Sequence, residues 1–190
     1  MKFLTKVLLL FFIGISYAKA SPATDWLQNE IDKILLAYKN ETISEKERFL
    51  LIEKTINENF AGAGIAKFVS GEAWNKASKE DKKRYIKIFK KHLALNIATM
   101  MQGYSNQEYR LINSKFDEKS KVSLIDMEIL GETGKLLVTW RVKESKDRYY
   151  VIDLIVANIS LVVTKRSEFN SMLRKVDNDL NQFEYRYPNY

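Results

Sequence analysis

The stretch from residue 149 to residue 183 constrains the fold most, because it predicts a strand, a turn and a helix in immediate succession. Its first eight residues, YYVIDLIV, form an apolar run that only Asp153 interrupts, and the β-branched and aromatic residues in it are typical of a buried strand. Asn158 and Ser160 end this run. From Leu161 onward the apolar residues recur at helical spacing, and Ser160 is a suitable N-cap for that helix.

This order resembles the C-terminal signature of the MlaC family, also called the toluene-tolerance auxiliary family. Tyr149 stands where the family usually has Trp, and Asn158 stands where it has a glycine that adopts positive φ, a conformation that Asn tolerates next best. The residues in register with the signature are Asp153, Leu154, Ile159, Ser160, Leu161 and Phe169. Residues 69–74 and Ala77, Ser78, Tyr85, Phe89 and Leu93 are similar too, so the resemblance covers about residues 25–183.

The resemblance implies a periplasmic carrier that shuttles phospholipid between the outer and inner membranes and so maintains the lipid asymmetry of the outer membrane. The implied partners are diacyl phospholipid, an inner-membrane ABC transporter complex with MCE domains, and an outer-membrane lipoprotein complex. Because the head group of a carried lipid can stay in water, we expect loose specificity for it.

The resemblance also directs attention to the apolar residues that would line a lipid cavity. Ile97 stands where the family often has Tyr, and Val138 shares the apolar face of its strand with Leu136 and Trp140. We expect the lining to include Phe68, Leu93, Ile97, Met101, Val138, Trp140, Leu154 and Val156. Composition alone favours the alternative that these residues fill an ordinary core, because apolar stripes usually mean packing. An apolar small-molecule-binding protein or a purely structural interaction protein therefore stays an alternative.

Residues 1–20 have the pattern of a cleavable signal peptide. Lys2 and Lys6 precede a short apolar segment, and Ala18-Lys19-Ala20 fits a cleavage site. The alternative is an uncleaved anchor, but the apolar segment is short for a bilayer span. Cleavage would leave residues 21–190 as a single domain in the periplasm and lower the formal net charge from +7 to +4 through the loss of three lysines. The sequence has no cysteine, which excludes a disulfide scaffold.

The remaining pattern predicts an α+β fold, with N-terminal helices, a four-stranded antiparallel sheet and a C-terminal helix. The resemblance implies that these elements together enclose the lipid cavity. A phase change in the apolar alternation predicts a β-bulge between Leu124 and Ile125. The expected helices begin at Asp25 as N-cap, after Ser44, at about residue 61, after Ser78 and at Leu161; the expected strands cover residues 109–116, 122–129, 136–142 and 149–156.

Few residues fit catalysis. His92, the single histidine, has no acid at a meaningful spacing, and we expect it to be a surface or half-buried helical residue. Asp153 is the best candidate for a perturbed acid, yet we expect it to bind turn amides or to pair with Lys165 or Arg166. No enzyme activity, metal or cofactor is predicted. Lys83, Lys87 and Lys90 lie on one side of their helix, either as an ordinary solvated face or as a docking surface for an acidic partner or an anionic leaflet. Nucleic acid is not an expected partner, because the chain carries no recognition motif.

Overall fold

The computed structural model describes residues 21–40, 42–104, 107–131 and 134–185 of the chain. The predicted signal peptide lies outside these residues. In chain order the elements are α1 (Pro22–Lys39), α2 (Glu45–Asn59), α3 (Gly62–Ser70), α4 (Ala73–Lys76), α5 (Lys79–Met101), β1 (Glu108–Asp117), β2 (Val122–Gly131), β3 (Gly134–Ser145), β4 (Arg148–Val156), β5 (Ile159–Ser160) and α6 (Leu161–Arg174). The predicted α+β class is confirmed, with one short strand more than expected.

Serine caps fix where the helices begin. Ser44 forms a capping box with Glu47, and the hydroxyl oxygens of Ser78 and Ser160 accept bonds from the backbone N–H of Asp81 and Val163. These three helix starts agree with the prediction. The predicted start of α1 at Asp25 is wrong, because Ser21 is the N-cap and Pro22 follows it, where its fixed φ and missing N–H suit the first turn.

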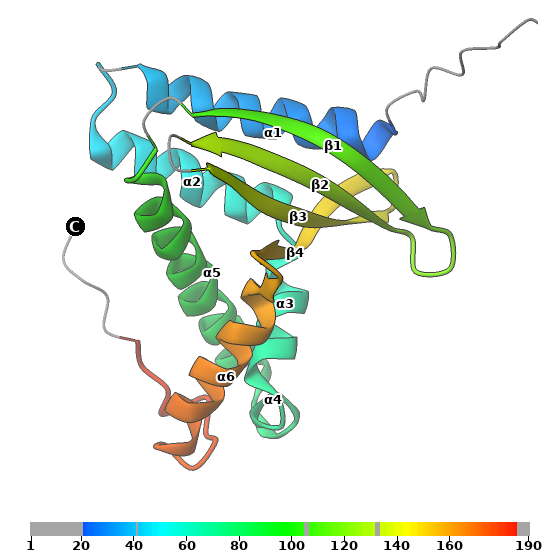
Figure 1. Cartoon of the computed structure of the whole chain (residues 1–190). Helices are drawn as coiled ribbons and strands as arrows, with labels where there is room; N and C mark the ends of the chain where they lie inside the picture. Colours follow the sequence, from blue (N-terminus) through cyan, green and yellow to red (C-terminus); the bar gives the residue numbers. More distant parts are fainter. Residues whose placement is uncertain (1–20, 41, 105–106, 132–133, 186–190) are drawn as a thin grey trace, which may run out of the picture.

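The sheet is an antiparallel meander in the order β1-β2-β3-β4-β5 (Figure 1). The predicted bulge in β2 is wrong: β2 pairs with β3 without a register shift, and Leu124 is simply exposed on the face opposite Ile125. The register shifts lie instead in β1 and β4. Ile112 has no partner in the register between β1 and β2, and Ile152 has none in the register between β3 and β4, so each is the extra residue of a bulge. The positive φ predicted at Asn158 is confirmed, and Ala157 shares it in the two-residue turn that leads to β5.

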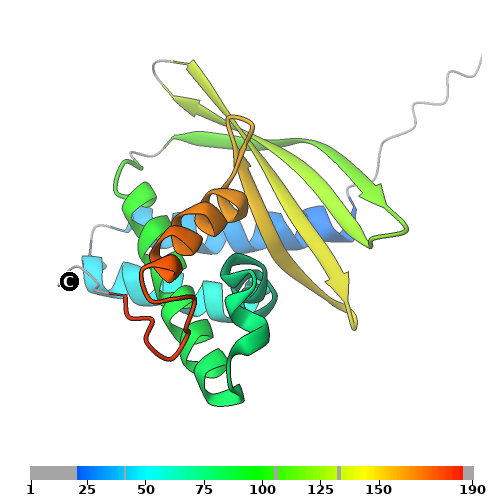
Figure 2. The same cartoon turned by 90° about the horizontal axis from the view of Figure 1, so that it is seen from below.

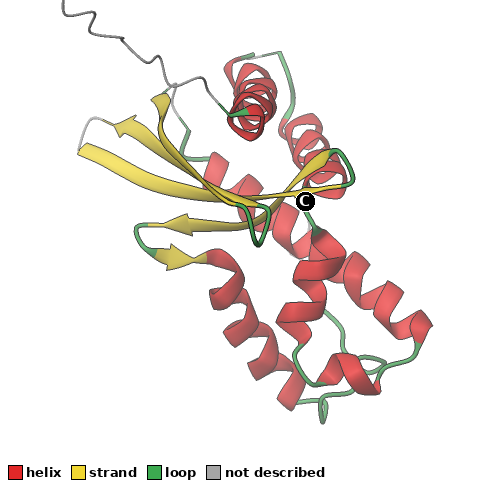
Figure 3. Cartoon of the chain, turned by 90° about the vertical axis from the view of Figure 1, so that its right-hand side faces the viewer, coloured by secondary structure: helices red, strands yellow, loops and turns green. Residues whose placement is uncertain are grey.

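The helices form two groups around the sheet. Helix α1 runs beside the sheet with α2 next to it, whereas α3–α6 gather below, as Figures 1 and 3 show. Trp26 of α1 packs against Tyr149 of β4 with ring centroids 5.8 Å apart, so the aromatic residue at position 149 holds the start of α1. Among the helices that the structure describes, none combines the length and the apolar character needed to cross a bilayer.

The lower half has a densely packed aromatic core. Tyr85 and Phe89 of α5 meet Phe169 of α6 and Phe183 of the C-terminal segment, and each is at most 2% exposed. Beyond α6 the chain turns back along α5 (Figure 2), where the guanidinium of Arg84 donates to backbone carbonyls of residues 180, 181 and 183. This segment therefore closes the core from the C-terminal side.

Two polar residues, His92 and Asp153, are almost completely buried. His92 is only 4% exposed, because α6 and the C-terminal segment cover it with the rings of Phe169 and Tyr185, so its predicted surface or half-buried position is wrong. Asp153 is also 4% exposed.

The contacts of Asp153 agree only in part with the prediction. As expected, its carboxylate accepts from a turn amide, the backbone N–H of Val162 at 3.1 Å, and also from the Ser160 hydroxyl at 2.7 Å. The alternative contact, a pairing with Lys165 or Arg166, is not the one formed, since the nearby cation is Arg141 at 3.7 Å on the adjacent strand. Lys165 instead pairs with Glu168 at 2.8 Å.

Candidate functional site

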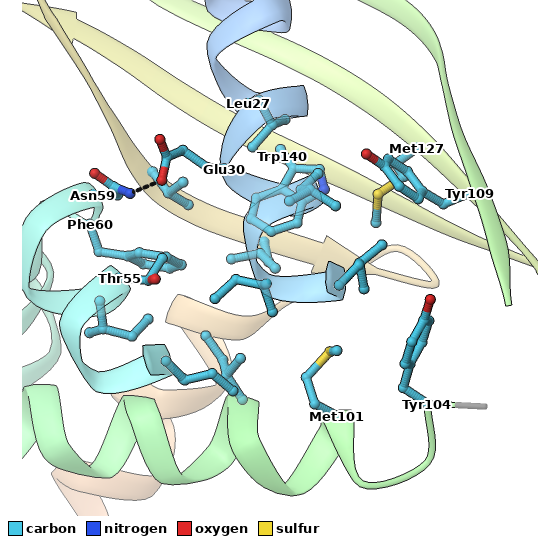
Figure 4. Close-up of a pocket in the computed structure, with 18 of the residues that line it drawn as sticks. Leu27, Glu30, Thr55, Asn59, Phe60, Met101, Tyr104, Tyr109, Met127 and Trp140 are labelled. Carbon is cyan, nitrogen blue, oxygen red and sulfur yellow. Dashed lines mark hydrogen bonds between the residues drawn. The ribbon is translucent and has the colours of Figure 1, made fainter. Parts of the chain in front are cut away.

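An apolar cavity of about 170 Å³ lies between the sheet and the helices α1, α2 and α5. Figure 4 shows the side chains that converge on it from these elements. Helix α1 supplies Trp26, Leu27, Ile31, Ile34 and Leu35; α2 supplies Ile52 and Ile56, with Phe60 after it; α5 supplies Ile97 and Met101; the sheet supplies Tyr109, Met127, Ile129, Trp140, Val151 and Leu154. Such a lining has no strong polar partner for water, so the cavity favours an apolar occupant.

One end of the cavity is lined by polar groups that already have hydrogen-bond partners within the protein. Glu30, Thr55 and Asn59 lie at this end, away from Tyr104 and Tyr109 (Figure 4). The carboxylate of Glu30 accepts from the Asn59 amide at 2.6 Å and from the Lys33 ammonium at 2.6 Å. The Thr55 hydroxyl donates to the carbonyl of Leu51 at 2.9 Å. The polar groups at this end are thus already engaged within the protein.

At the other end, hydrogen bonds connect α1 to β1. The Tyr109 hydroxyl donates to the Asp32 carboxylate at 2.6 Å and accepts from the Gln28 amide, which also donates to Asp32 at 3.2 Å. Burial raises the pKa of Tyr109, and the bond to the negative Asp32 raises it further, so the phenol stays protonated as a donor. These bonds hold the helix and the strand together beside the cavity.

Two buried polar groups of the lining are not engaged. The indole N–H of Trp140 and the hydroxyl of Tyr104 have no hydrogen-bond partner among the described residues. A buried donor without a partner costs about 1–3 kcal/mol. A ligand that brings an acceptor, such as an ester carbonyl, relieves that cost.

Four of the eight residues expected to bind lipid line this cavity: Ile97, Met101, Trp140 and Leu154. The other four lie elsewhere. Leu93 and Val138 are 1% and 4% exposed within the main core, where neighbouring side chains enclose them. Val156 packs against the same core from its edge. Phe68 is 44% exposed, because α3 directs its neighbours Ile65 and Val69 inward, and its ring is covered by the Arg166 guanidinium at 4.4 Å.

The sequence reasoning did not assign α1, α2 or β2 to the lining. The signal was present as apolar spacing, at Leu27, Ile31, Ile34 and Leu35 in α1, at Ile52 and Ile56 in α2, and at Met127 and Ile129 in β2. Periodicity tells which face of an element is buried, but it does not tell whether that face meets a neighbour or an empty space.

The lysines expected to dock a partner lie on α5, away from the cavity. Lys83 and Lys87 are exposed. Lys90 is half-buried, with its aliphatic stem over Gly62 and its ammonium 3.5 Å from the carbonyl of Asn57. No group of three His, Cys, Asp or Glu side chains in the described part of the chain is placed to hold a metal ion.

An α+β domain that keeps an apolar cavity between its sheet and its helices has the architecture of a binding protein for apolar ligands. Comparison with known families agrees with this class. The chain belongs to the MlaC protein family, which residues 28–182 match.

A solved structure with a similar fold is the phospholipid-binding protein from Ralstonia solanacearum, determined in complex with a phospholipid. The TM-score is 0.74 at 15% sequence identity, and the match covers 85% of this chain and 92% of that chain. Nothing among the curated proteins matches the sequence.

Proposed function

We propose that this protein is a periplasmic carrier that binds phospholipid in its apolar cavity and shuttles it between the outer and inner membranes, which maintains the lipid asymmetry of the outer membrane. Its partners are an outer-membrane lipoprotein complex and an inner-membrane ABC transporter complex with MCE domains. The observation that carries the proposal is the apolar cavity between the sheet and α1, α2 and α5. Membership of the MlaC family and the phospholipid in the similar Ralstonia structure support it.

The physical argument concerns the acyl chains. Each CH₂ group exposed to water costs about 0.8 kcal/mol, so a diacyl lipid does not cross an aqueous compartment unassisted at a useful rate. A dry apolar cavity offers the chains an environment comparable to the bilayer. The free energy of the lipid is then nearly the same in the bilayer and in the protein. The partners therefore set the direction of transfer.

The cavity volume sets a condition on this proposal. A cavity of about 150 Å³ lined by apolar side chains holds a molecule the size of benzene, and the cavity here is about 170 Å³. The two chains of a phospholipid are far larger than benzene. Lipid loading therefore requires the sheet and the helices around the cavity to move apart. The same volume favours a second candidate function, the binding of a small apolar molecule.

Mass spectrometry of organic extracts separates these functions. Protein purified from an envelope fraction, with no lipid added, should carry phospholipid in a constant molar ratio. Recovery of a small apolar compound in place of phospholipid would support the second candidate. Protein that is consistently empty and takes up no lipid from liposomes would contradict both.

We also propose that the exposed lysines of α5 contribute to docking on an acidic partner or an anionic membrane surface. Reversal of Lys83, Lys87 and Lys90 to Glu should leave bound lipid unchanged and slow lipid transfer, with an effect that shrinks as salt rises. Because the Lys90 stem covers Gly62, the double variant Lys83→Glu, Lys87→Glu should be compared with the triple variant.

A matched control reverses Lys115, Lys119 and Lys146, which are exposed residues of the sheet and its hairpins. This control variant has the same net charge as the α5 triple variant. Equal transfer rates in both triple variants and the unmodified protein would show that the α5 lysines are an ordinary solvated face.

A further inference from the structure

A second hollow, of about 460 Å³, adjoins the end of the cavity at which Tyr109 lies. It lies between the C-terminal half of α1 and the start of β1, which run next to each other in Figure 1. Leu35, Gln107 and Tyr109 line both spaces, so the hollow continues the cavity toward solvent. A molecule with its apolar part in the cavity can place its polar part in this hollow.

The hollow carries charges of both signs, unlike the cavity. Its charged lining residues are Asp32, Lys39 and Glu108, and all three are exposed. Asp32 already accepts bonds from Tyr109 and Gln28. Within the described part of the chain, no ion pair involves Lys39 or Glu108. One cation and one carboxylate are therefore available to a ligand.

We propose that this hollow is the head-group site of the carrier and that it selects a head group with both a phosphate and a primary amine. The inference rests on the proposed phospholipid-binding function. Lys39 binds the phosphate, and Glu108 binds the ammonium. The C-terminal end of α1, where carbonyl groups point outward, adds a partial negative charge that also favours a cation.

The same charges act against an anionic head group. Because Asp32 and Glu108 line the hollow together with Lys39, it has an excess of one negative charge. A head group with a phosphate and no amine gains the contact with Lys39 but faces both carboxylates. Exposed ion pairs contribute little individually, so the selection is moderate rather than absolute.

The boundary between the two spaces suits the ester region of the lipid. The hydroxyl of Tyr104 is buried, lines the cavity and has no partner among the described residues. It lies at the same end of the cavity as Tyr109 (Figure 4). At the opposite end, the described polar groups are engaged, because Glu30 is already bonded to Asn59 and Lys33. The lipid therefore enters with its chains toward Glu30 and its head group toward Lys39.

The test is uptake from vesicles that contain phosphatidylethanolamine and phosphatidylglycerol in equal amounts, with the bound lipids quantified by mass spectrometry. The unmodified protein should be enriched in phosphatidylethanolamine by about threefold, the effect expected of one exposed ion pair. Glu108→Gln should bring the ratio close to one. Lys39→Gln should lower the total amount of bound lipid of both kinds.

Two control variants and circular dichroism separate failure of the head-group site from failure of the carrier function. Glu72→Gln and Lys119→Gln change exposed charges outside the hollow and should leave the ratio unchanged. Lipid bound at the vesicle ratio in every variant would overturn the head-group site and leave the phospholipid carrier intact. Failure to bind either lipid would instead overturn the carrier function itself. Circular dichroism of each variant shows whether the fold is retained.

Discussion

Enlargement of one side chain distinguishes a cavity wall from a solid core, and α5 provides a matched pair of positions. Ile97 lines the cavity, whereas Leu93, one turn earlier, is 1% exposed in the core. An empty apolar cavity destabilises a protein by about 24 cal/mol per Å³. For a cavity of about 170 Å³ this amounts to about 4 kcal/mol.

We therefore expect Ile97→Trp and Leu93→Trp to have opposite effects on the lipid-free protein. A Trp side chain that fills about a quarter of the cavity would raise the free energy of unfolding by about 1 kcal/mol. At Leu93 the added atoms have no free space, and overpacking should cost about 1–3 kcal/mol or more. Ile97→Trp should lower the lipid content, because the indole occupies space that the acyl chains need.

The measurement combines urea unfolding of delipidated protein with the amount of lipid per molecule before delipidation. If Ile97→Trp destabilised the protein as much as Leu93→Trp, the wall at Ile97 would be packed and the cavity argument would be wrong. Unchanged lipid content in Ile97→Trp would equally refute the reasoning. Val138→Trp belongs with Leu93→Trp in this comparison, because Val138 is enclosed by the core rather than by the cavity.

Two further predictions concern the buried polar residues. Burial, assisted by the nearby Lys165, lowers the pKa of His92 to about 4. The unfolded chain therefore binds a proton between pH 6.5 and 4 that the native protein does not, and the stability should fall as the pH falls through this window, by up to about 1.4 kcal/mol per pH unit. Urea titrations at several pH values should show that the free energy of unfolding of His92→Gln falls less between pH 6.5 and 4 than that of the unmodified protein. The same pH dependence in both proteins would contradict this prediction. Asp153→Ala leaves the N–H of Val162 and the Ser160 hydroxyl without their acceptor and should cost about 1–3 kcal/mol, and Asp153→Asn, which keeps one acceptor oxygen, should cost less. Equal unfolding midpoints for Asp153→Ala and the unmodified protein would show that the carboxylate is dispensable to the fold.

Local chemistry made the element boundaries predictable where a single residue type determines them. Ser44, Ser78 and Ser160 each supply the hydroxyl oxygen that a helix start requires, and Asn158 accepts the positive φ of the turn before β5. The start of α1 was misplaced because Asp25 and Ser21 are both acceptable N-caps. Proline at the next position decides in favour of Ser21.

Contacts between distant segments were less predictable, because periodicity describes each element separately. One of the two alternatives for Asp153 was a pairing with Lys165 or Arg166, yet its cation lies across the sheet at Arg141, opposite it in the β3–β4 register. His92 was expected at the surface or half-buried, and the packing of α6 and of the returning C-terminal segment against α5 buries it. Both outcomes depend on tertiary pairing that no local pattern contains.

The cavity is the feature that sequence reasoning reached least directly, because it consists of space that side chains leave empty. Its cost of about 4 kcal/mol is a large fraction of the roughly 5–15 kcal/mol by which a domain of this size is stable. The aromatic core at the N-terminal half of α5 offsets that cost: the centroids of its ring pairs are 5.4–6.1 Å apart, and each such pair contributes about 0.5–1.5 kcal/mol beyond its buried area. Helix α5 thus faces the cavity with Ile97 and Met101 and the solid core with Tyr85 and Phe89. Tyr85, Phe89 and the two phenylalanines that they contact do not line the cavity. These aromatic contacts can therefore persist when the sheet and the helices around the cavity move apart to admit a lipid.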